Sequence, residues 1–194
     1  MQLYHVSSSI LNIGDVLQCN HLDLKRFISP FVLAARAGED VFIATQCAAR
    51  YSDERTKAIA GDGVSQKMAT EGIFEFVRCE KFSTMCPRYN SLYLFDGIDC
   101  CRAFATEFRK GVRSFIYTVE VQDSEIRKHD MNLYTQADSL IVNSYKKSEK
   151  KFEQAIKLAE SYWAGKIAEN SIIECLLGRN ALVTSIVETI EQAV

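Results

Sequence analysis

The sequence predicts an α+β fold whose helices lie mainly early in the chain and whose strands lie mainly late. Apolar residues have helical spacing from Asp23 to about Phe82, whereas the segments of strand composition follow Pro87. This order does not show the regular strand–helix alternation that is typical of a parallel sheet. No Gly/Ser linker, low-complexity tract or internal repeat divides the 194 residues, so we expect one domain over 1–194.

The composition predicts a globular protein with a real hydrophobic core. Hydrophobic residues make up 47% of the chain and charged residues 25%, which excludes disorder and collagen-like structure for most of the length. The net charge of −2 gives no global attraction to nucleic acid or to an anionic membrane. The chain has no apolar run close to the roughly 18 residues of a membrane span, and its start lacks the pattern of a secretory signal. We therefore expect a soluble cytoplasmic protein.

The elements of the first half follow from apolar spacing and from breaking residues. Residues 3–7 have strand composition, and the next residues form a turn or a single helical turn that ends at Gly14. Asp23 can cap a helix that ends at Gly38, and a second helix is expected around 41–49. A third helix is expected around 73–77.

The second half of the chain is expected to contain both strands and helices. Strands are expected at 91–95, 114–121, 172–177 and 181–184, and helices at 98–110, 144–165 and 186–190.

The cysteines favour free thiols over a disulfide framework or a metal centre. Seven cysteines occur, an odd number, and none forms a C-x-x-C pair. The three histidines do not lie near cysteines at zinc-ligand spacing, so we expect no metal. Phosphate-binding glycine loops, a nucleophile elbow and H-E-x-x-H are also absent from the sequence. Cys100 and Cys101 lie inside a predicted helix with no histidine nearby in sequence, which makes a thiol nucleophile a weak hypothesis.

Four polar residues stand where the pattern is otherwise apolar or turn-like. They are His5, Tyr93, Asp130 and Glu174. Each has an ordinary structural explanation. His5 suits a hydrogen-bonded histidine on an edge-like strand, and Tyr93 suits a core tyrosine with its hydroxyl at the surface. Asp130 suits an Asx-turn in a loop. Glu174, inside an apolar strand, either faces solvent or lines a cleft.

In order along the chain, these residues resemble the motifs of the rifampin ADP-ribosyltransferases. Those enzymes begin with Tyr-His-Gly-Thr, a Leu, and then Gly-Asp with an apolar pair, to which residues 3–17 are similar. A strand with a tyrosine and an alanine-rich helix follow, as in 92–110. Ile116–Glu120 repeats the family's Ile-Tyr-x-Val-Glu, and 130–133 resembles its Asp-x-Asn-Leu loop.

The chain also resembles a bacterial family of uncharacterised proteins with the same plan. Its members carry a Tyr-Trp motif on a late helix and then a strand with a glutamate, as in 162–165 and 173–176. The chain departs from the rifampin enzymes in having Val6 for their glycine and Ser7 for their threonine. It also has an added helical region, 23–82, between the first and second motif blocks.

The resemblance implies an ADP-ribosyltransferase-like split β-sheet whose cleft holds NAD in a bent form. Cleavage of the nicotinamide–ribose bond develops an oxocarbenium-like cation, as in glycoside hydrolysis. His5 corresponds to the histidine that bonds a ribose hydroxyl and fixes the adenosine half, and Tyr93 to the tyrosine that stacks on nicotinamide. Either Asp130 or Glu174 corresponds to the carboxylate near the ribose. Glu174 is slightly favoured because its apolar neighbours make an inward charge costly unless it is used.

Three further residues are candidates for contacts with NAD. Donors at Val6 and Ser7 could meet the pyrophosphate or the nicotinamide amide. Arg88, just upstream of the tyrosine strand, is the candidate cation for a phosphate, and its alternative is an ordinary exposed arginine.

The resemblance leaves three functions open. The first is an NAD-dependent mono-ADP-ribosyltransferase that modifies a macromolecule, as a bacterial or phage toxin, effector or antiviral defence enzyme. The added helical region favours it, since it offers surface for a large target or a protein partner. The second is a small-molecule transferase of the rifampin type, and the third a non-catalytic binding module on the same fold. The acceptor, whether protein, nucleic acid or small molecule, is left open.

Overall fold

The computed structural model describes residues 2–19, 64–122, 126–142 and 149–191. Contacts group the chain into two compact units. The sheet unit comprises Met1–His21, Asn90–Met131 and Gly165–Val194, and the helical unit comprises Leu22–Tyr89 and Asn132–Ala164. The helices expected between residues 23 and 49 lie outside the described residues.

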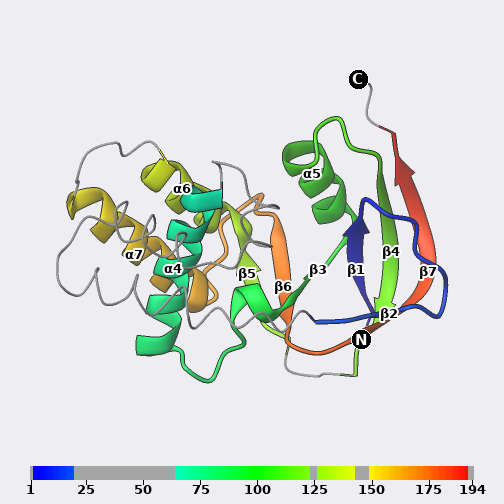
Figure 1. The fold of residues 1–194 in the computed structure, drawn as a ribbon, viewed down its shortest axis with the longest axis horizontal. Coiled ribbons are helices and arrows are strands. Elements are labelled where there is room, and N and C mark those ends of the chain that lie inside the picture. Colours follow the sequence, from blue (N-terminus) through cyan, green and yellow to red (C-terminus); the bar gives the residue numbers. More distant parts are fainter. Residues whose placement is uncertain (1, 20–63, 123–125, 143–148, 192–194) are drawn as a thin grey trace. The chain divides into compact units, whose positions relative to one another are not determined.

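The sheet unit is built on seven antiparallel strands, which with the helices make the fold α+β (Figure 1). The strands are β1 (Gln2–Ser7), β2 (Val16–Leu17), β3 (Leu92–Phe95), β4 (Ser114–Glu120), β5 (Lys128–Asp130), β6 (Ile173–Leu177) and β7 (Ala181–Ile190). Their order across the sheet is β2-β7-β4-β1-β3-β6-β5. β1 therefore lies inside the sheet between β4 and β3, and the expectation of an edge-like strand around His5 is wrong.

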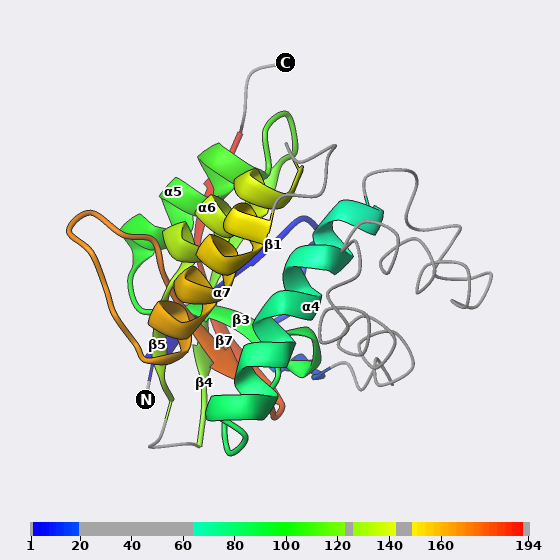
Figure 2. The same ribbon diagram turned by 90° about the vertical axis from the view of Figure 1, so that its left-hand side faces the viewer.

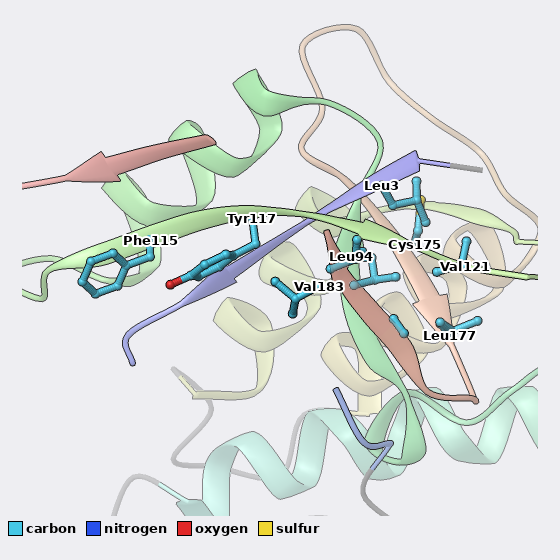
Figure 3. Packing of buried hydrophobic residues seen from close by; sticks show 10 residues of the cluster. Leu3, Leu94, Phe115, Tyr117, Val121, Cys175, Leu177 and Val183 are labelled. Atoms are coloured by element: carbon cyan, nitrogen blue, oxygen red, sulfur yellow. The ribbon is translucent and has the colours of Figure 1, made fainter. Parts of the chain in front are cut away.

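Each face of this sheet carries its own hydrophobic cluster. The first cluster draws side chains from five strands, including Leu3, Leu94 and Cys175 (Figure 3). The second lies on the opposite face, where helix α5 (Ile98–Phe108) packs against β1, β3 and β4. Its buried members include Phe95 from β3 and Cys101 from α5. Because strand side chains alternate between faces, neighbouring residues of β1 and β3 contribute to different clusters.

The predicted strands and helix of the central region are confirmed with small shifts at their ends. β1, β3, α5, β4 and β6 lie where apolar alternation or helical spacing predicts them. β2 was not predicted, because two residues carry too little pattern. It follows a turn at Gly14, whose φ of 94° is easily adopted by glycine, and it pairs with Leu182 and Ala181 of β7.

The helix expected at 186–190 is wrong, because β7 continues as a strand to Ile190. β7 pairs with β4 over its length, and the register shifts between Ile116 and Tyr117 and again between Thr118 and Val119. A bulge adds a residue and interrupts the two-residue period. The apolar residues Ile186, Val187 and Ile190 therefore do not alternate with polar ones, and their spacing resembles that of one face of a helix.

The loop expected at residues 130–133 is also wrong. Asp130 ends β5, and helix α6 (Met131–Val142) begins directly after it. The start of α6 is fixed to the sheet, because the Met131 amide donates to the carbonyl of Ile172. β5 has only three residues and passes directly into α6, so the sequence carries too little strand pattern there to distinguish the strand from a loop.

The helical unit is held together by α4 (Val64–Lys81), α6 and α7 (Glu149–Trp163), of which α4 and α7 pack side by side (Figure 2). Phe74 of α4 is fully buried, with its ring centroid 5.0 Å from that of Tyr134 and 5.1 Å from that of Tyr162. The indole nitrogen of Trp163 donates to the Phe74 carbonyl at 2.8 Å. These contacts join all three helices, and they confirm the predicted helix around 73–77.

Arg88 lies in the middle of this aromatic group, in the 3-10 helix η1 (Arg88–Asn90). It is only 4% exposed, and its guanidinium lies 4.1 Å from the Tyr134 ring centroid. The guanidinium also bonds the Tyr162 hydroxyl and pairs with the carboxylate of Glu71 at 3.3 Å. A buried arginine needs such partners, because its charge cannot be removed by deprotonation. The alternative of an ordinary exposed arginine is therefore wrong.

We expect Arg88→Gln to lower the free energy of unfolding by about 3 kcal/mol, because it removes the buried charge that pairs with Glu71 and stacks on Tyr134. Urea denaturation followed by circular dichroism measures this. Arg102→Gln is the matched control, since Arg102 is half exposed where it pairs with Glu188, and its loss should be much smaller. Equal losses for the two variants would contradict a central role for Arg88.

Candidate functional site

β1 and β3 are joined by a single registered residue pair, fewer than any other two neighbouring strands of the sheet. Tyr4 pairs with Phe95 at this junction, whereas β1 and β4 are paired at six positions from Gln2 to Ser7. An antiparallel ladder that continued from Tyr4 and Phe95 would pair Val6 with Tyr93. That pair is not among the registered ones, so two well-paired groups of strands, β2-β7-β4-β1 and β3-β6-β5, meet at one point.

The side chain of His5 bonds across this junction. Its Nδ1 lies 3.3 Å from the carbonyl oxygen of Tyr93, 88 residues later in the chain. Because a carbonyl only accepts, the contact assigns the hydrogen to Nδ1 and leaves Nε2 of the neutral ring as an acceptor. His5 thus bonds the Tyr93 carbonyl across the junction, and it presents a lone pair on its other nitrogen.

The surroundings of His5 keep its imidazole neutral. Burial lowers the pKa of His5 below its ordinary value of 6.5, the bond to the Tyr93 carbonyl partly offsets this, and the positive charge of Arg109 lowers it further. At neutral pH the ring is therefore an uncharged hydrogen-bonding group. Among the described residues, Arg109 is the cation whose charge acts on His5.

Tyr93 and Glu174 are brought to the same face of the sheet. Glu174 of β6 pairs in register with Phe95, two residues after Tyr93 on β3. Residues two apart in a strand share a face. Tyr93 is half buried, and Glu174 is only 1% exposed, which excludes the interpretation that Glu174 faces solvent. Strand alternation assigns His5 to the other face, so His5 meets Tyr93 through the main chain and not through the phenol ring.

Asp130 is placed on a strand, not in a loop, and it is 1% exposed. Its Oδ2 accepts from the Ala168 amide at 3.1 Å and from the Ser171 hydroxyl at 2.6 Å. These bonds fasten the segment that leads into β6. Asp130 pairs with Ile173, next to Glu174, so alternation assigns the two carboxylates to opposite faces.

Val6 and Ser7 follow His5 on β1 with different surroundings. Val6 is buried in the cluster beneath α5. The Ser7 hydroxyl donates to the Ser9 carbonyl at 2.8 Å and accepts from the Ser9 amide at 3.0 Å. The serine hydroxyl is thus engaged in a local turn. Its availability to a ligand stays a prediction.

Arg88, which the sequence analysis selected as a candidate cation for a phosphate, and Arg109, which it did not select, belong to different units. Arg88 belongs to the helical unit and is paired there with Glu71. Arg109 caps the C-terminal end of α5 in the sheet unit, close enough to His5 to affect its pKa. A basic residue is common at a helix C-terminus, so Arg109 gave no signal of its own in the sequence.

In the part of the chain that the structure describes, no group of three or more histidine, cysteine, aspartate or glutamate side chains is arranged to hold a metal ion. The six cysteines in this part are free, and Cys47 lies outside it. None of its helices has the length and apolar character needed to cross a membrane. The chemistry of the site thus consists of a neutral imidazole, a tyrosine ring, buried carboxylates and one nearby guanidinium.

We expect His5 to titrate below pH 6.5, with its hydrogen on Nδ1 in the neutral form. Because the folded state disfavours protonation, the contribution of His5 to stability is fully present above pH 6.5 and falls as the pH drops below it. Long-range ¹H–¹⁵N NMR of the imidazole measures the pKa and the tautomer directly. In His5→Gln, this part of the pH dependence of unfolding should disappear, whereas a His5 pKa at or above 6.5 would contradict the assignment.

The model of one protein family, described as "Protein of unknown function (DUF2441)", matches residues 3–191. This range includes every candidate residue named above. No curated protein matches the chain. Since the family model covers nearly the whole length, the chain belongs to the DUF2441 family.

Proposed function

We propose that the protein is an NAD-dependent mono-ADP-ribosyltransferase that modifies a macromolecule and releases nicotinamide. The observation that carries the proposal is the junction between β1 and β3, where the neutral imidazole of His5 is fixed by the Tyr93 carbonyl. The split-sheet arrangement expected from the resemblance to rifampin ADP-ribosyltransferases needs such a place. A single registered pair between two groups of strands supports it.

In this proposal His5 recognises a ribose hydroxyl. Its Nδ1 hydrogen is directed to the Tyr93 carbonyl, so Nε2 accepts a hydrogen bond from the O–H of the sugar. A protonated imidazole would lose this ability, because both nitrogens would then donate. The lowered pKa of His5 therefore suits an acceptor for a hydroxyl at neutral pH.

Tyr93 has the side chain that suits the nicotinamide ring. It is half buried at the same strand that supplies the carbonyl for His5, and an aromatic face can stack on a planar ring and fix its orientation. The same residue would then link the two halves of the substrate site, its carbonyl acting on the adenosine half through His5 and its ring on nicotinamide.

The transfer step breaks the bond between ribose C1′ and the nicotinamide nitrogen. The bonding electron pair leaves with nicotinamide, which becomes neutral, and positive charge develops on the ribose. An oxygen or nitrogen nucleophile of the acceptor supplies the electron pair for the new bond to C1′, and its proton passes to a carboxylate or to water. A fixed negative charge near the ribose lowers the energy of this cationic transition state.

Glu174 suits this role better than Asp130. Asp130 accepts two hydrogen bonds that hold the segment before β6, and strand alternation assigns it to the face opposite Tyr93. Glu174 shares a sheet face with Tyr93, is only 1% exposed, and pairs in register with Phe95 on β3 and with His129 on β5, so its charge acts where water is excluded. Asp130 stays the competing candidate, as the match to the rifampin enzymes implies.

The acceptor is inferred to be a macromolecule from the helical unit. This unit has its own buried aromatic core around Phe74 and Arg88, beyond what a compact antibiotic-modifying enzyme would need. Such an addition supplies surface for a large target or a protein partner. A toxin, effector or defence enzyme of a bacterium or phage fits this plan.

The function is tested by incubating the protein with NAD labelled on the adenine half, in whole-cell lysate. Nicotinamide release with label on protein or nucleic acid supports the proposal. Label on a small molecule would indicate a rifampin-type enzyme instead. Absence of nicotinamide release, with the protein folded, would indicate a binding module that does not turn NAD over.

We expect Glu174→Gln to lower the turnover of NAD by at least about a hundredfold, because it removes the charge that stabilises the cation. Asp130→Asn is the paired comparison, and it should retain more activity. Nicotinamide release is measured by chromatography, and NAD binding and the melting temperature serve as controls for folding. Full turnover by Glu174→Gln together with loss in Asp130→Asn would assign the chemistry to Asp130.

We expect Tyr93→Ala to weaken NAD binding more than Tyr93→Phe does. Stacking uses the ring face, which phenylalanine retains, and it contributes on the order of 1 kcal/mol beyond the buried area. Calorimetric titration with NAD measures both variants. Equal losses would show that the phenol hydroxyl or the packing of the strand matters, and not the ring face.

A further inference from the structure

His129 is a buried polar residue that the proposed mechanism does not use. It is 2% exposed and lies in the middle of β5, directly opposite Glu174 in the register of β5 and β6. Side chains that face each other across an antiparallel pair have Cβ atoms about 5 Å apart, so they share a face and lie within reach of each other. The register therefore brings an imidazole beside the carboxylate that the proposed function places near the ribose.

The two side chains lie on the face of the sheet against which α5 packs. Glu174 is also in register with Phe95 on β3, and Phe95 belongs to the hydrophobic cluster on this face. Phe95, Glu174 and His129 thus form a row across three neighbouring strands. Met131, two residues after His129, and Ile172, two residues before Glu174, belong to the same cluster. The carboxylate and the imidazole therefore lie beside an apolar cluster and away from solvent.

β5 has only three residues, but both neighbours of His129 fasten it to other segments. Lys128 forms an ion pair with Asp96, directly after β3, at 2.7 Å. Asp130 accepts two hydrogen bonds from the segment before β6. His129 is therefore held opposite Glu174 from both sides, which fixes the backbone positions from which the two side chains extend.

Packing alone does not require a histidine at this position. An apolar residue of similar size would fill the same space without the cost of removing polar nitrogens from water. In the part of the chain that the structure describes, no buried side-chain nitrogen or oxygen lacks a hydrogen-bond partner, so the fully buried polar atoms of His129 and Glu174 are bonded. Polar groups that are satisfied inside a protein hold defined orientations.

We propose that His129 is a positioning residue for Glu174, whose carboxylate it orients towards the ribose. The inference rests on the proposed function, because it concerns the group that meets the cation. Both the neutral and the protonated imidazole carry at least one N–H, so His129 can donate to a carboxylate oxygen in either form. A carboxylate held in this way needs no reorientation when positive charge develops on the ribose, and fixed charges lower a transition state most under this condition.

The test is the kinetics of nicotinamide release by full-length His129→Leu, which removes the N–H donors and keeps an apolar side chain in the core. Because Glu174 acts on the transition state, kcat should fall about tenfold or more while KM for NAD changes little. His129→Gln, whose side-chain amide retains an N–H donor, should keep more of the activity. A wild-type kcat in His129→Leu, or a raised KM in place of a lowered kcat, would overturn the inference.

A double variant separates positioning from a purely structural role. His129→Leu should have no further effect on kcat in the Glu174→Gln background, because the carboxylate through which it acts is already removed. A loss by the same factor in both backgrounds would assign His129 to stability alone and overturn the inference.

Lys128→Gln is the matched control for a disturbed β5. It breaks a half-exposed ion pair and leaves the imidazole in place, so kcat should stay within about twofold of the wild-type value. If Lys128→Gln lost as much activity as His129→Leu, the effect would belong to β5 as a whole, and the specific role of His129 would be wrong.

The outcomes distinguish this inference from the proposed function. If folded wild-type protein releases no nicotinamide, both are wrong. If it does, but Glu174→Gln keeps full turnover, the proposed function stands and the role of His129 is wrong. Melting temperatures show whether each variant is folded. Should His129→Leu not fold, the side-chain ¹⁵N shifts of His129 are compared between wild type and Glu174→Gln. They should differ, and equal shifts would overturn the inference.

Discussion

The hydrogen bond from His5 to the carbonyl of Tyr93 is the constraint on which the interpretation of this fold depends. It lies where two neighbouring strands share a single registered pair, between a four-stranded group that contains β1 and a three-stranded group that contains β3. The bond joins a side chain of β1 to the main chain of β3, so it adds a contact where the two strands share a single registered pair. The same bond sets the tautomer of His5 and thereby gives the imidazole a defined acceptor.

The surroundings of the junction determine what chemistry it can support. The two hydrophobic clusters stabilise opposite faces of the sheet, and their strands hold Tyr93 and Glu174 on one face. Asp130 is used to fasten the segment before β6, and Arg88 to stabilise the helical unit. The proposed function assigns His5, Tyr93 and Glu174 to contacts with the dinucleotide.

Much of the sheet could be predicted from the sequence, because β1, β3, β4 and β6 carry alternating or continuous apolar patterns with clear turns. β7 and α6 could not. Bulges in the pairing of β7 with β4 disturb the period of two, and α6 begins without a loop after Asp130. The candidate site residues were found by their order along the chain, whereas their faces depend on register. The bond between His5 and Tyr93 has no local signal, since it joins segments 88 residues apart.

The most direct test of the central claim is the ¹⁵N chemical shift of His5 Nε2 during a titration with NAD. The account predicts a saturable change at Nε2 of the kind caused by a new hydrogen bond to an acceptor nitrogen, with Nδ1 still protonated and bonded to Tyr93. An unchanged Nε2 signal at NAD concentrations that saturate the protein would contradict it.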